Sequence, residues 1–401
     1  MRRTFSDLES QTFDVLVIGG GITGAGIARD ASMRGLSVAI IDKSAWASGT
    51  SSKSSRLIHG GIRYLEHGQI GMVRESVRER EILMRIAPHL VKPLEFTWPV
   101  YRGARLPKWK LRIGLFIYDF LAGKRRVRRH RGLDAAAVLE GEPNLKRDWL
   151  VGGASYFDAS TDDAGLTIAN IESARANGAV AVDFAQAESM TVTGDRADGW
   201  IVRDMAETGE ARVRARTVVS ATGPWQTKGT KGSHIAVPRG RIGNHSAVTM
   251  IAPQDGRVMF VLPSGDRAIV GTTDIYSDES PDDVKASDAE IEYLLKAANS
   301  YFPDSALTRD DIVDTWAGIR PLAASPAGTN PSSISREHLI SRDRAGVIVV
   351  TGGKLTTYRS MAAEIVDEIE RGLGRAPRRA ATDQVPLEPS IPWRAYQSTV
   401  R

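Results

Sequence analysis

The chain has 401 residues, a length that usually needs more than one hydrophobic core, so two domains are expected. Hydrophobic residues make up 42% and charged residues 25%, which is typical of a globular protein and excludes a disordered one. The absence of cysteine excludes disulfides, thiolate metal ligands and thiol nucleophiles, and no metal site is expected. The polar start of the chain predicts no signal peptide, and no apolar segment is long enough to span a bilayer.

The first predicted unit is a strand followed by a glycine-rich turn. The run 14–18 is apolar and β-branched, which is typical of a strand buried on both faces. Gly19, Gly21 and Gly24 then form the pattern G-x-G-x-x-G. In such a turn the first glycine permits a tight bend, the second lets the backbone approach a pyrophosphate, and the third lets a helix pack against the strand.

A helix over 22–34 and a second strand over 36–41 complete this unit. The helix begins with Ile22 and Thr23, and its free N–H groups and partial positive charge favour phosphate. The second strand ends in Asp42, an acid placed to accept a hydrogen bond from a ribose hydroxyl. The unit therefore predicts an adenine dinucleotide site, without separating FAD from NAD.

Residues 46–68 are rich in serine and glycine, so an ordered loop leading into a short helix is expected there. Small residues with hydroxyl and N–H groups suit a loop that lies against a flat polar ligand. Arg56, His59, Arg63 and Tyr64 stand among them. Taken singly, each fits a surface arginine or a core histidine better than a functional residue.

A strongly basic region follows an amphipathic helix predicted over 74–86. Between residues 102 and 131 Asp119 is the only acid. The bases of this region are Arg102, Arg105, Lys108, Lys110, Arg112, Lys124, Arg125, Arg126, Arg128, Arg129 and Arg131. Apolar side chains fall near one helical face within it: Trp109, Ile113, Phe116, Ile117, Phe120 and Leu121. This pattern suits a helix lying in a membrane surface, although a core-packed helix with a solvated charge run, or less favourably a nucleic-acid patch, fits too.

The second half of the chain reads as strands and three further helices. Asp162 and Asp163 can cap a helix over 164–177. Strands are expected over 181–184, 190–192, 199–203, 211–220, 235–237, 258–262, 268–271 and 347–350, with helices over 287–301 and 361–369. The pieces between 231 and 301 suggest a mixed, largely antiparallel sheet that caps a substrate. The Pro- and Arg-rich tail from Arg375 is expected to be loosely held.

Several motifs occur together in order along the chain: SSKSSRLIHGGIRYLEHG, RIGLFIYD, DDAGL, ATGPW, KGSHI, GTTD, DDIV, GIRPL and GGKLTTYR. With them the chain, from about residue 14 to 369, resembles the FAD-dependent glycerol-3-phosphate dehydrogenases, which belong to the D-amino-acid-oxidase-like flavoprotein superfamily. Two departures stand out: the segment between Gly223 and Lys231 is shorter than usual, and the usual C-terminal helical domain does not follow.

The resemblance implies an α/β fold with a Rossmann-like FAD-binding domain of the glutathione-reductase/D-amino-acid-oxidase type and a mixed antiparallel-sheet cap domain. Its FAD-binding parts are expected at 11–90, 155–225 and 336–374. A cap or membrane-facing region is expected at 91–154, a substrate-binding cap at 226–335 and a tail at 375–401.

The same resemblance implies FAD as the cofactor. With no cysteine, a cysteinyl link to the flavin is excluded. The residues expected to bind FAD are Gly19, Gly21, Ile22, Thr23, Gly24, Asp42, Lys43, Thr50, Ser51, Ser52, Ser54, Ser55, Leu57, His59, Gly60, Gly61, Ala221, Thr222, Gly223, Gly352, Gly353, Lys354, Leu355 and Thr356.

The implied reaction is oxidation of sn-glycerol 3-phosphate to dihydroxyacetone phosphate by hydride transfer to FAD. Arg320 and Arg336 would hold the phosphate, because guanidinium forks match phosphate oxygens. The other residues of this pocket would be Arg63, Tyr64, His234, Thr273 and Asp274. His59, or second to it His234, would be the general base, and Lys354 would stabilise charge on the reduced flavin.

The resemblance further implies a membrane quinone as electron acceptor and a peripheral position on the inner face of the cell membrane. A homodimer is possible, and nucleic acid is not expected as a partner. Two alternatives remain open at this point. One is an oxygen-using glycerophosphate or amino-acid oxidase, and the other is a non-catalytic flavin-binding paralogue.

Overall fold

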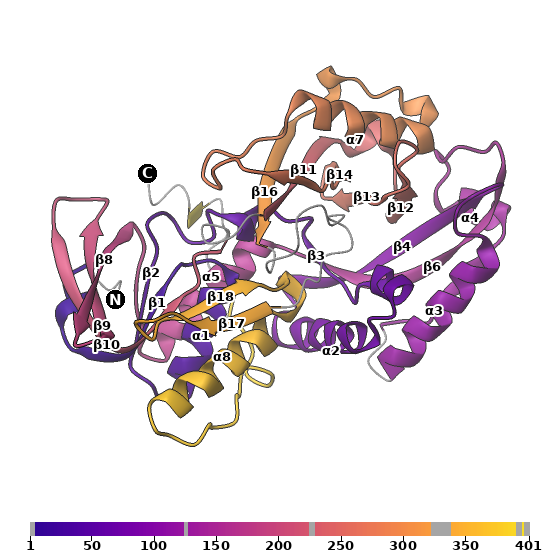
Figure 1. Ribbon diagram of the computed structural model, residues 1–401. Helices are drawn as coiled ribbons and strands as arrows, with labels where there is room; N and C mark the ends of the chain where they lie inside the picture. Colours follow the sequence, from indigo (N-terminus) through magenta and orange to yellow (C-terminus); the bar gives the residue numbers. More distant parts are fainter. Residues whose placement is uncertain (1–4, 124–126, 224–228, 322–337, 390–394, 397–401) are drawn as a thin grey trace.

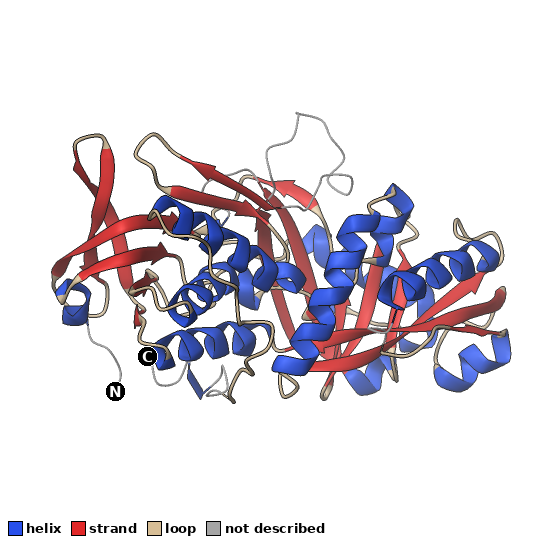
Figure 2. Cartoon of the chain, turned by 90° about the horizontal axis from the view of Figure 1, so that it is seen from below, coloured by secondary structure: helices blue, strands red, loops and turns tan. Residues whose placement is uncertain are grey.

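The computed structural model describes residues 5–123, 127–223, 229–321, 338–389 and 395–396. Two sheets lie side by side in an elongated molecule (Figure 1). Seen from below, helices lie across the strands along its whole length (Figure 2). No helix of the described residues is both long and apolar enough to cross a membrane.

The first sheet has a parallel centre that begins with the glycine-rich unit. Its strand order is β17-β18-β10-β1-β2-β7, and β9 and β8 extend it from β10. The strands are β1 (Thr12–Ile18), β2 (Val38–Ile41), β7 (Val180–Val182), β8 (Ala185–Thr193), β9 (Arg196–Asp204), β10 (Glu210–Ser220), β17 (His338–Arg342) and β18 (Ile348–Gly352). Strands β18, β10, β1, β2 and β7 run parallel to their neighbours in this order, whereas β17 and the β8–β9 hairpin are antiparallel.

Three helices cover one face of this sheet: α1 (Ile22–Met33), α5 (Asp163–Ala176) and α8 (Tyr358–Gly372). Ala25, Ala28 and Ala31 of α1 are fully buried, as the helical spacing predicts. Asp162 caps α5, because its carboxylate accepts a hydrogen bond of 2.9 Å from the Gly165 amide. The chain passes from the end of β1 at Ile18 to the start of α1 at Ile22 through the glycine-rich turn.

The second sheet is antiparallel except where β12 meets β4. Its order is β15-β11-β14-β13-β12-β4-β6-β3, with β16 beside β11 and β5 beside β6. The strands are β3 (Leu57–Ile58), β4 (Val91–Tyr101), β5 (Arg131–Leu133), β6 (Leu150–Thr161), β11 (Gly229–Pro238), β12 (Ala247–Ile251), β13 (Val258–Ser264), β14 (Arg267–Gly271), β15 (Ile275–Ser277) and β16 (Asp314–Pro321). Its helices are α2 (Ile70–Ile86), α3 (Lys108–Ala122), α4 (Ala135–Gly141), α6 (Arg239–Ile242) and α7 (Asp288–Tyr301).

The α/β fold class is confirmed, but the sequence reading missed several elements. The long strands β4 and β6 and the strand β16 were not predicted, and α2 begins four residues before the predicted start at 74. The loop 46–68 contains the short strand β3 and a 3-10 helix over Ile62–His67.

The prediction of a loosely held tail is wrong for its described part. Leu387 is buried against the α2 region, and Tyr396 is buried in the core of the first sheet. The Tyr396 hydroxyl accepts a hydrogen bond from the Trp46 amide and contacts Asp183. The prediction failed because the tail is mostly polar, so its composition does not show that Leu387 and Tyr396 are buried.

Helix α3 lies at one end of the molecule, beside the long strands β4 and β6 (Figure 1). Leu111, Leu115 and Tyr118 point inward and are buried. The opposite face exposes large apolar side chains: Trp109 at 60%, Ile113, Phe116 at 65%, Ile117 and Phe120 at 77%. The predicted apolar face is therefore not packed into the core, although α3 is core-packed through its opposite face. Leu121, expected on the same face, packs inward instead.

Candidate active site

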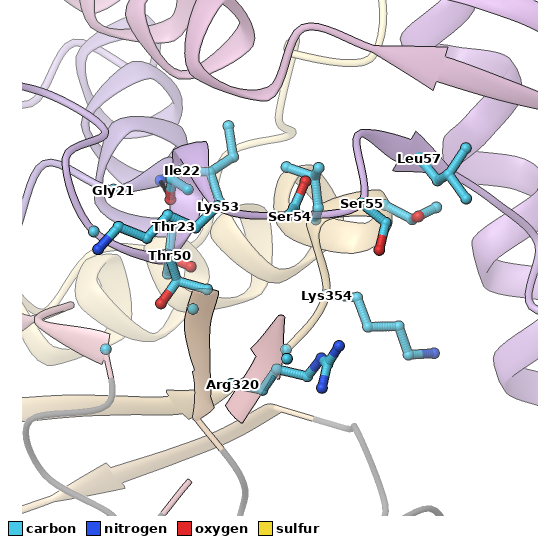
Figure 3. Close-up of a pocket in the computed structure, with 18 of the residues that line it drawn as sticks. Gly21, Ile22, Thr23, Thr50, Lys53, Ser54, Ser55, Leu57, Arg320 and Lys354 are labelled. Carbon is cyan, nitrogen blue, oxygen red and sulfur yellow. Dashed lines mark hydrogen bonds between the residues drawn. The ribbon is translucent and has the colours of Figure 1, made fainter. Parts of the chain in front are cut away.

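A cavity of about 680 Å³ lies where the two sheets meet. The α1 N-terminus lines one end of it, Arg320 of β16 and the turn 352–356 line the other, and the loop 48–55 runs between them (Figure 3). Figure 3 shows Gly21, Ile22, Thr23 and Thr50 grouped together, with Arg320 and Lys354 across an opening from Ser54 and Ser55. One cavity thus joins the predicted cofactor residues to the predicted substrate residues.

The glycine-rich turn leaves no room for side chains at two of its three positions. Gly19 has φ +113°, and a Cβ there would lie 2.5 Å from the Ala221 carbonyl oxygen. A Cβ on Gly24 would lie 1.9 Å from the Gly19 carbonyl oxygen. A Cβ on Gly21 would meet only the Ser51 Oγ, at 3.0 Å, so this position borders open space in front of α1. This is the arrangement that lets a pyrophosphate approach a helix N-terminus.

Polar side chains fix the loops around this end. The Ser51 hydroxyl accepts a hydrogen bond of 2.9 Å from the Ile22 amide. Asp42 accepts hydrogen bonds from the Gly20 amide at 2.6 Å and the Ser44 amide at 2.9 Å. Burial raises the pKa of Asp42, against the lowering effect of these two bonds. Each carboxylate oxygen has a further lone pair, so Asp42 can hold the loop and still accept a hydroxyl.

The turn after β18 brings a cation to the other end. Gly352 and Gly353 have φ of +75° and +90°, a backbone conformation that favours glycine. Lys354 follows them, and its Nζ lies 4.2 Å from the centre of the Tyr64 ring. The Thr356 hydroxyl accepts a hydrogen bond from the His59 amide and donates one to the His59 carbonyl. The predicted base and the predicted charge-stabilising lysine are therefore held by one turn.

Arg320 projects from β16 and is held in a fixed orientation. Its guanidinium donates to the Asp274 carboxylate at 3.0 Å, the Thr272 hydroxyl at 3.0 Å and the Thr273 carbonyl at 3.3 Å. A second guanidinium, that of Arg257, lines the same cavity and donates to the Asp274 carbonyl at 2.8 Å. Two arginines around one aspartate leave a net positive charge, which suits an anionic substrate.

The two candidate histidines differ in their surroundings. His234 is buried on β11, stacks on Trp316 with ring centres 5.1 Å apart, and has its Nε2 2.8 Å from the Ser55 hydroxyl. Burial, then the charges of Arg320 and Arg56, lower the pKa of His234 to about 3. His234 is therefore neutral near pH 7 and a weak base. His59 is half-buried and lines the cavity.

Most of the predicted site residues line this cavity. They are Gly19, Gly21, Ile22, Thr23, Asp42, Lys43, Thr50, Ser51, Ser54, Ser55, Leu57, His59, Gly61, Tyr64, Ala221, Thr222, Gly223, His234, Asp274, Arg320, Gly352, Gly353, Lys354, Leu355 and Thr356. Arg336 and the side chain of Arg63 lie outside the described part of the structure.

Four predicted residues are not part of the lining. Gly24 packs inside the turn, and Ser52 contacts the Gly49 carbonyl. Thr273 turns away from the cavity, since its buried hydroxyl donates to Glu290 at 2.7 Å and accepts from the Ser233 amide. Gly60 packs against Tyr118, whose hydroxyl lies 2.1 Å from where a Cβ would stand.

The sequence reading missed a group of lining residues on β4, β6 and β13 or just before β13. These are Phe96, Trp98, Tyr156, Asp158, Arg257, Val258 and Phe260. Phe96 stacks on Tyr156 and meets Phe260 edge-on, which gives this wall an aromatic surface. These residues do not belong to a short sequence motif. They come together only through the pairing of strands that are distant in the sequence, so local patterns could not predict them.

A family model described as "FAD dependent oxidoreductase" matches residues 14–367. The aerobic glycerol-3-phosphate dehydrogenase of Staphylococcus saprophyticus is 39% identical over 382 residues, which cover 92% of this chain and 68% of that protein. Its counterpart from Staphylococcus aureus is 37% identical over the same shares. The chain therefore belongs to the FAD-dependent oxidoreductase family and, within it, to the glycerol-3-phosphate dehydrogenases.

Among solved structures, the glycerol-3-phosphate dehydrogenase from Bacillus halodurans complexed with FAD matches with a TM-score of 0.79 and 30% identity. The match covers 98% of this chain and 71% of that one. The L-α-glycerophosphate oxidase from Mycoplasma pneumoniae, with FAD bound, matches with a TM-score of 0.69 at 17% identity, which shows the shared fold alone.

The residues present fit FAD, the cofactor of this family. The open space in front of Gly21 would receive the pyrophosphate at the α1 N-terminus, and Asp42 at the end of β2 would accept a ribose hydroxyl. Thr50 and Ser54 lie between there and Lys354 at the far end (Figure 3). This order of groups suits a long dinucleotide with a flavin at the Lys354 end.

Proposed function

We propose that this chain oxidises sn-glycerol 3-phosphate to dihydroxyacetone phosphate. The observation that carries the proposal is the Arg320–Asp274–Arg257 cluster at the far end of an FAD cavity. The names of the relatives point to the same substrate. Bound FAD supplies a hydride acceptor for C2 of the substrate, so the chain must bind the phosphate, orient C2 and accept the hydroxyl proton.

Phosphate binding is assigned to Arg320, with Arg257 beside it. Because Asp274 and Thr272 already hold the Arg320 guanidinium, little side-chain entropy is lost when an anion binds. Each charge-assisted hydrogen bond contributes about 1.5–3 kcal/mol. Tyr64 lines the same end, and Arg63 and Arg336 remain proposed members of this pocket.

Proton removal from the C2 hydroxyl is assigned to His59. Its backbone is held on both sides by the Thr356 hydroxyl, which fixes where the imidazole can reach. His234 is the weaker candidate, because burial and the arginine charges depress its basicity. Its neutral ring and its contact with Ser55 suit a residue that orients the substrate.

Lys354 and the amides of Gly352 and Gly353 are assigned to stabilising negative charge on the reduced cofactor. Lys354 lines the cavity at the end that the flavin would occupy. A fixed positive charge in a partly dry site stabilises such charge more strongly than water does.

The exposed face of α3 is the proposed point of attachment to an anionic membrane surface. Trp109, Phe116 and Phe120 would enter the interface while neighbouring lysines and arginines meet the headgroups. A protein held in this way has access to a membrane quinone, which we propose as the electron acceptor. The inner face of the cell membrane is the proposed location.

Anaerobic mixing with glycerol 3-phosphate tests the proposed reaction. The holoenzyme should lose its visible flavin absorbance and form one dihydroxyacetone phosphate per flavin. A flavin that stays oxidised would contradict the reaction and favour a non-catalytic paralogue. Turnover in air tests the acceptor, because stoichiometric peroxide would identify an oxygen-using oxidase.

Co-sedimentation with vesicles tests the membrane surface. Replacing Phe116 and Phe120 with serine should abolish binding to vesicles that contain anionic lipid, since these side chains supply buried apolar area. The matched control replaces Met190 and Val192 with serine. These are exposed apolar residues on β8, at the other end of the molecule (Figure 1). Equal binding by both variants would show that the exposed face of α3 is not the membrane-binding surface.

A further inference from the structure

Four elements meet at one buried carboxylate behind the His59 segment. Asp158 of β6 is 2% exposed, and its Oδ1 accepts hydrogen bonds from the Gly60 amide at 3.1 Å and from the Tyr118 hydroxyl at 2.6 Å. Arg80 of α2 pairs with the same oxygen. The cluster formed by Asp158, Tyr118 and Arg80 therefore connects α2, α3 and β6 to the backbone at Gly60.

Toward Asp158, Tyr118 and Arg80 both act only as hydrogen-bond donors. Burial, and then the nearby Asp158, raise the pKa of Tyr118 well above its usual value, so its hydroxyl stays protonated and donates to the carboxylate. Arg80 also donates to the Phe157 carbonyl and to the Tyr118 oxygen, each at 3.1 Å. Tyr118 and Arg80 are both buried. A buried charged network of this kind keeps one geometry only while every member is present.

The cluster acts on the backbone next to the proposed base. Gly60 lies directly after His59, and a Cβ at Gly60 would come within 2.1 Å of the Tyr118 hydroxyl and 2.6 Å of Val77. The loop is thus pressed against α3 and α2 on one side. On the other side the Thr356 hydroxyl holds the His59 backbone. His59, which lines the cavity, therefore belongs to a peptide that is fixed from both directions.

We propose that Asp158 and Tyr118 are positioning residues for flavin reduction, which hold the segment 59–61 so that His59 faces the substrate. The inference rests on the proposed function of His59. It assigns a catalytic purpose to the inner face of α3, the helix whose outer face is exposed. Neither residue needs to touch the substrate for this role, although Asp158 also lines the cavity.

The first test replaces Tyr118 with phenylalanine, which removes one hydroxyl and leaves the ring in place. The rate of flavin reduction at saturating glycerol 3-phosphate should fall by about fivefold to twentyfold, with little change in KM, since a small misplacement of a catalytic group is costly. Tyr301→Phe is the matched control, because the Tyr301 hydroxyl accepts a partly buried hydrogen bond from the Ile251 amide and Tyr301 does not line the cavity. Equal rates in the two variants would overturn the proposal.

Amide hydrogen exchange gives a readout that needs no substrate. Exchange at Gly60 should quicken in Tyr118→Phe and stay unchanged in Tyr301→Phe. If the wild-type flavin is not reduced by glycerol 3-phosphate but Gly60 still loses protection, the proposed function fails while the anchoring of the loop stands. Unchanged protection in Tyr118→Phe would refute the anchoring itself.

A second pair of variants separates anchoring from loss of folding. Asp158→Asn keeps an oxygen that can accept from Gly60, whereas Asp158→Ala does not, and both leave the Arg80 charge without its carboxylate. Asn should therefore preserve Gly60 protection and at least several times the reduction rate of Ala. Identical behaviour of the two would show that only the missing charge pair matters and would overturn the proposal.

Discussion

The two ends of the cavity differ in the groups that line them, which are mainly backbone at one end and side chains at the other. The end at α1 is made of backbone: glycines that leave no room for a Cβ, and amides at a helix start. The end at β16 is made of side chains from distant strands, among them Arg320 and Arg257. Under the proposed function, the first end would bind the FAD that the family shares, and the second would select the substrate.

The largest expected effect is at the backbone end. Gly24→Ala would place a Cβ 1.9 Å from the Gly19 carbonyl oxygen, so the turn must open and α1 must move. The variant should purify without FAD or fail to fold. Gly71→Ala is the control, because a Cβ there meets nothing within 4 Å, and it should keep a full complement of FAD. Normal FAD content in Gly24→Ala would contradict the tight turn.

At the side-chain end, Arg320→Ala should leave FAD bound and raise KM for glycerol 3-phosphate by about 10- to 150-fold for each charge-assisted hydrogen bond to the phosphate that the substitution removes. KM for glycerol, which lacks the phosphate, should change far less. Steady-state kinetics with both substrates check this. Equal effects on both would remove Arg320 from phosphate binding.

Arg257→Ala should have a smaller effect, a rise of about tenfold in KM, because Arg257 acts partly by holding Asp274. The control is Arg241→Ala, which also removes an arginine paired with an aspartate, at the surface. If Arg257→Ala behaves like this control, the second guanidinium does not serve the substrate.

The last expected effect concerns stability and pH and leaves substrate binding aside. The folded protein keeps His234 neutral, with a pKa of about 3, whereas the unfolded chain takes up a proton below about pH 6.5. Acid therefore favours unfolding, and the stability is lost as the pH falls from 6.5 toward 3. Between pH 6.5 and about pH 5 the loss amounts to about 2 kcal/mol.

His234→Gln removes this titration. Denaturant unfolding at about pH 7 and about pH 5 should show a smaller drop in the free energy of unfolding for the variant than for the wild type. Equal drops would mean that His234 already carries a proton in the folded protein.

The same contrast explains what the sequence could predict. The β1–α1–β2 unit follows from apolar periodicity and from glycines whose roles are local, and its buried alanines match. Phe96, Tyr156 and Phe260 come together only because β4, β6, β12 and β13 pair, which no local pattern reveals. The family resemblance placed Gly60 among the FAD-binding residues, but its small size serves the contact with Tyr118.

The central claim is that one cavity joins an FAD site to a phosphate-binding arginine cluster. A crystal structure of the holoenzyme with glycerol 3-phosphate, or with dihydroxyacetone phosphate, tests it most directly. The account predicts the phosphate within hydrogen-bond distance of Arg320, with C2 between the flavin and His59. A phosphate bound away from Arg320, with C2 out of reach of the flavin, would contradict it.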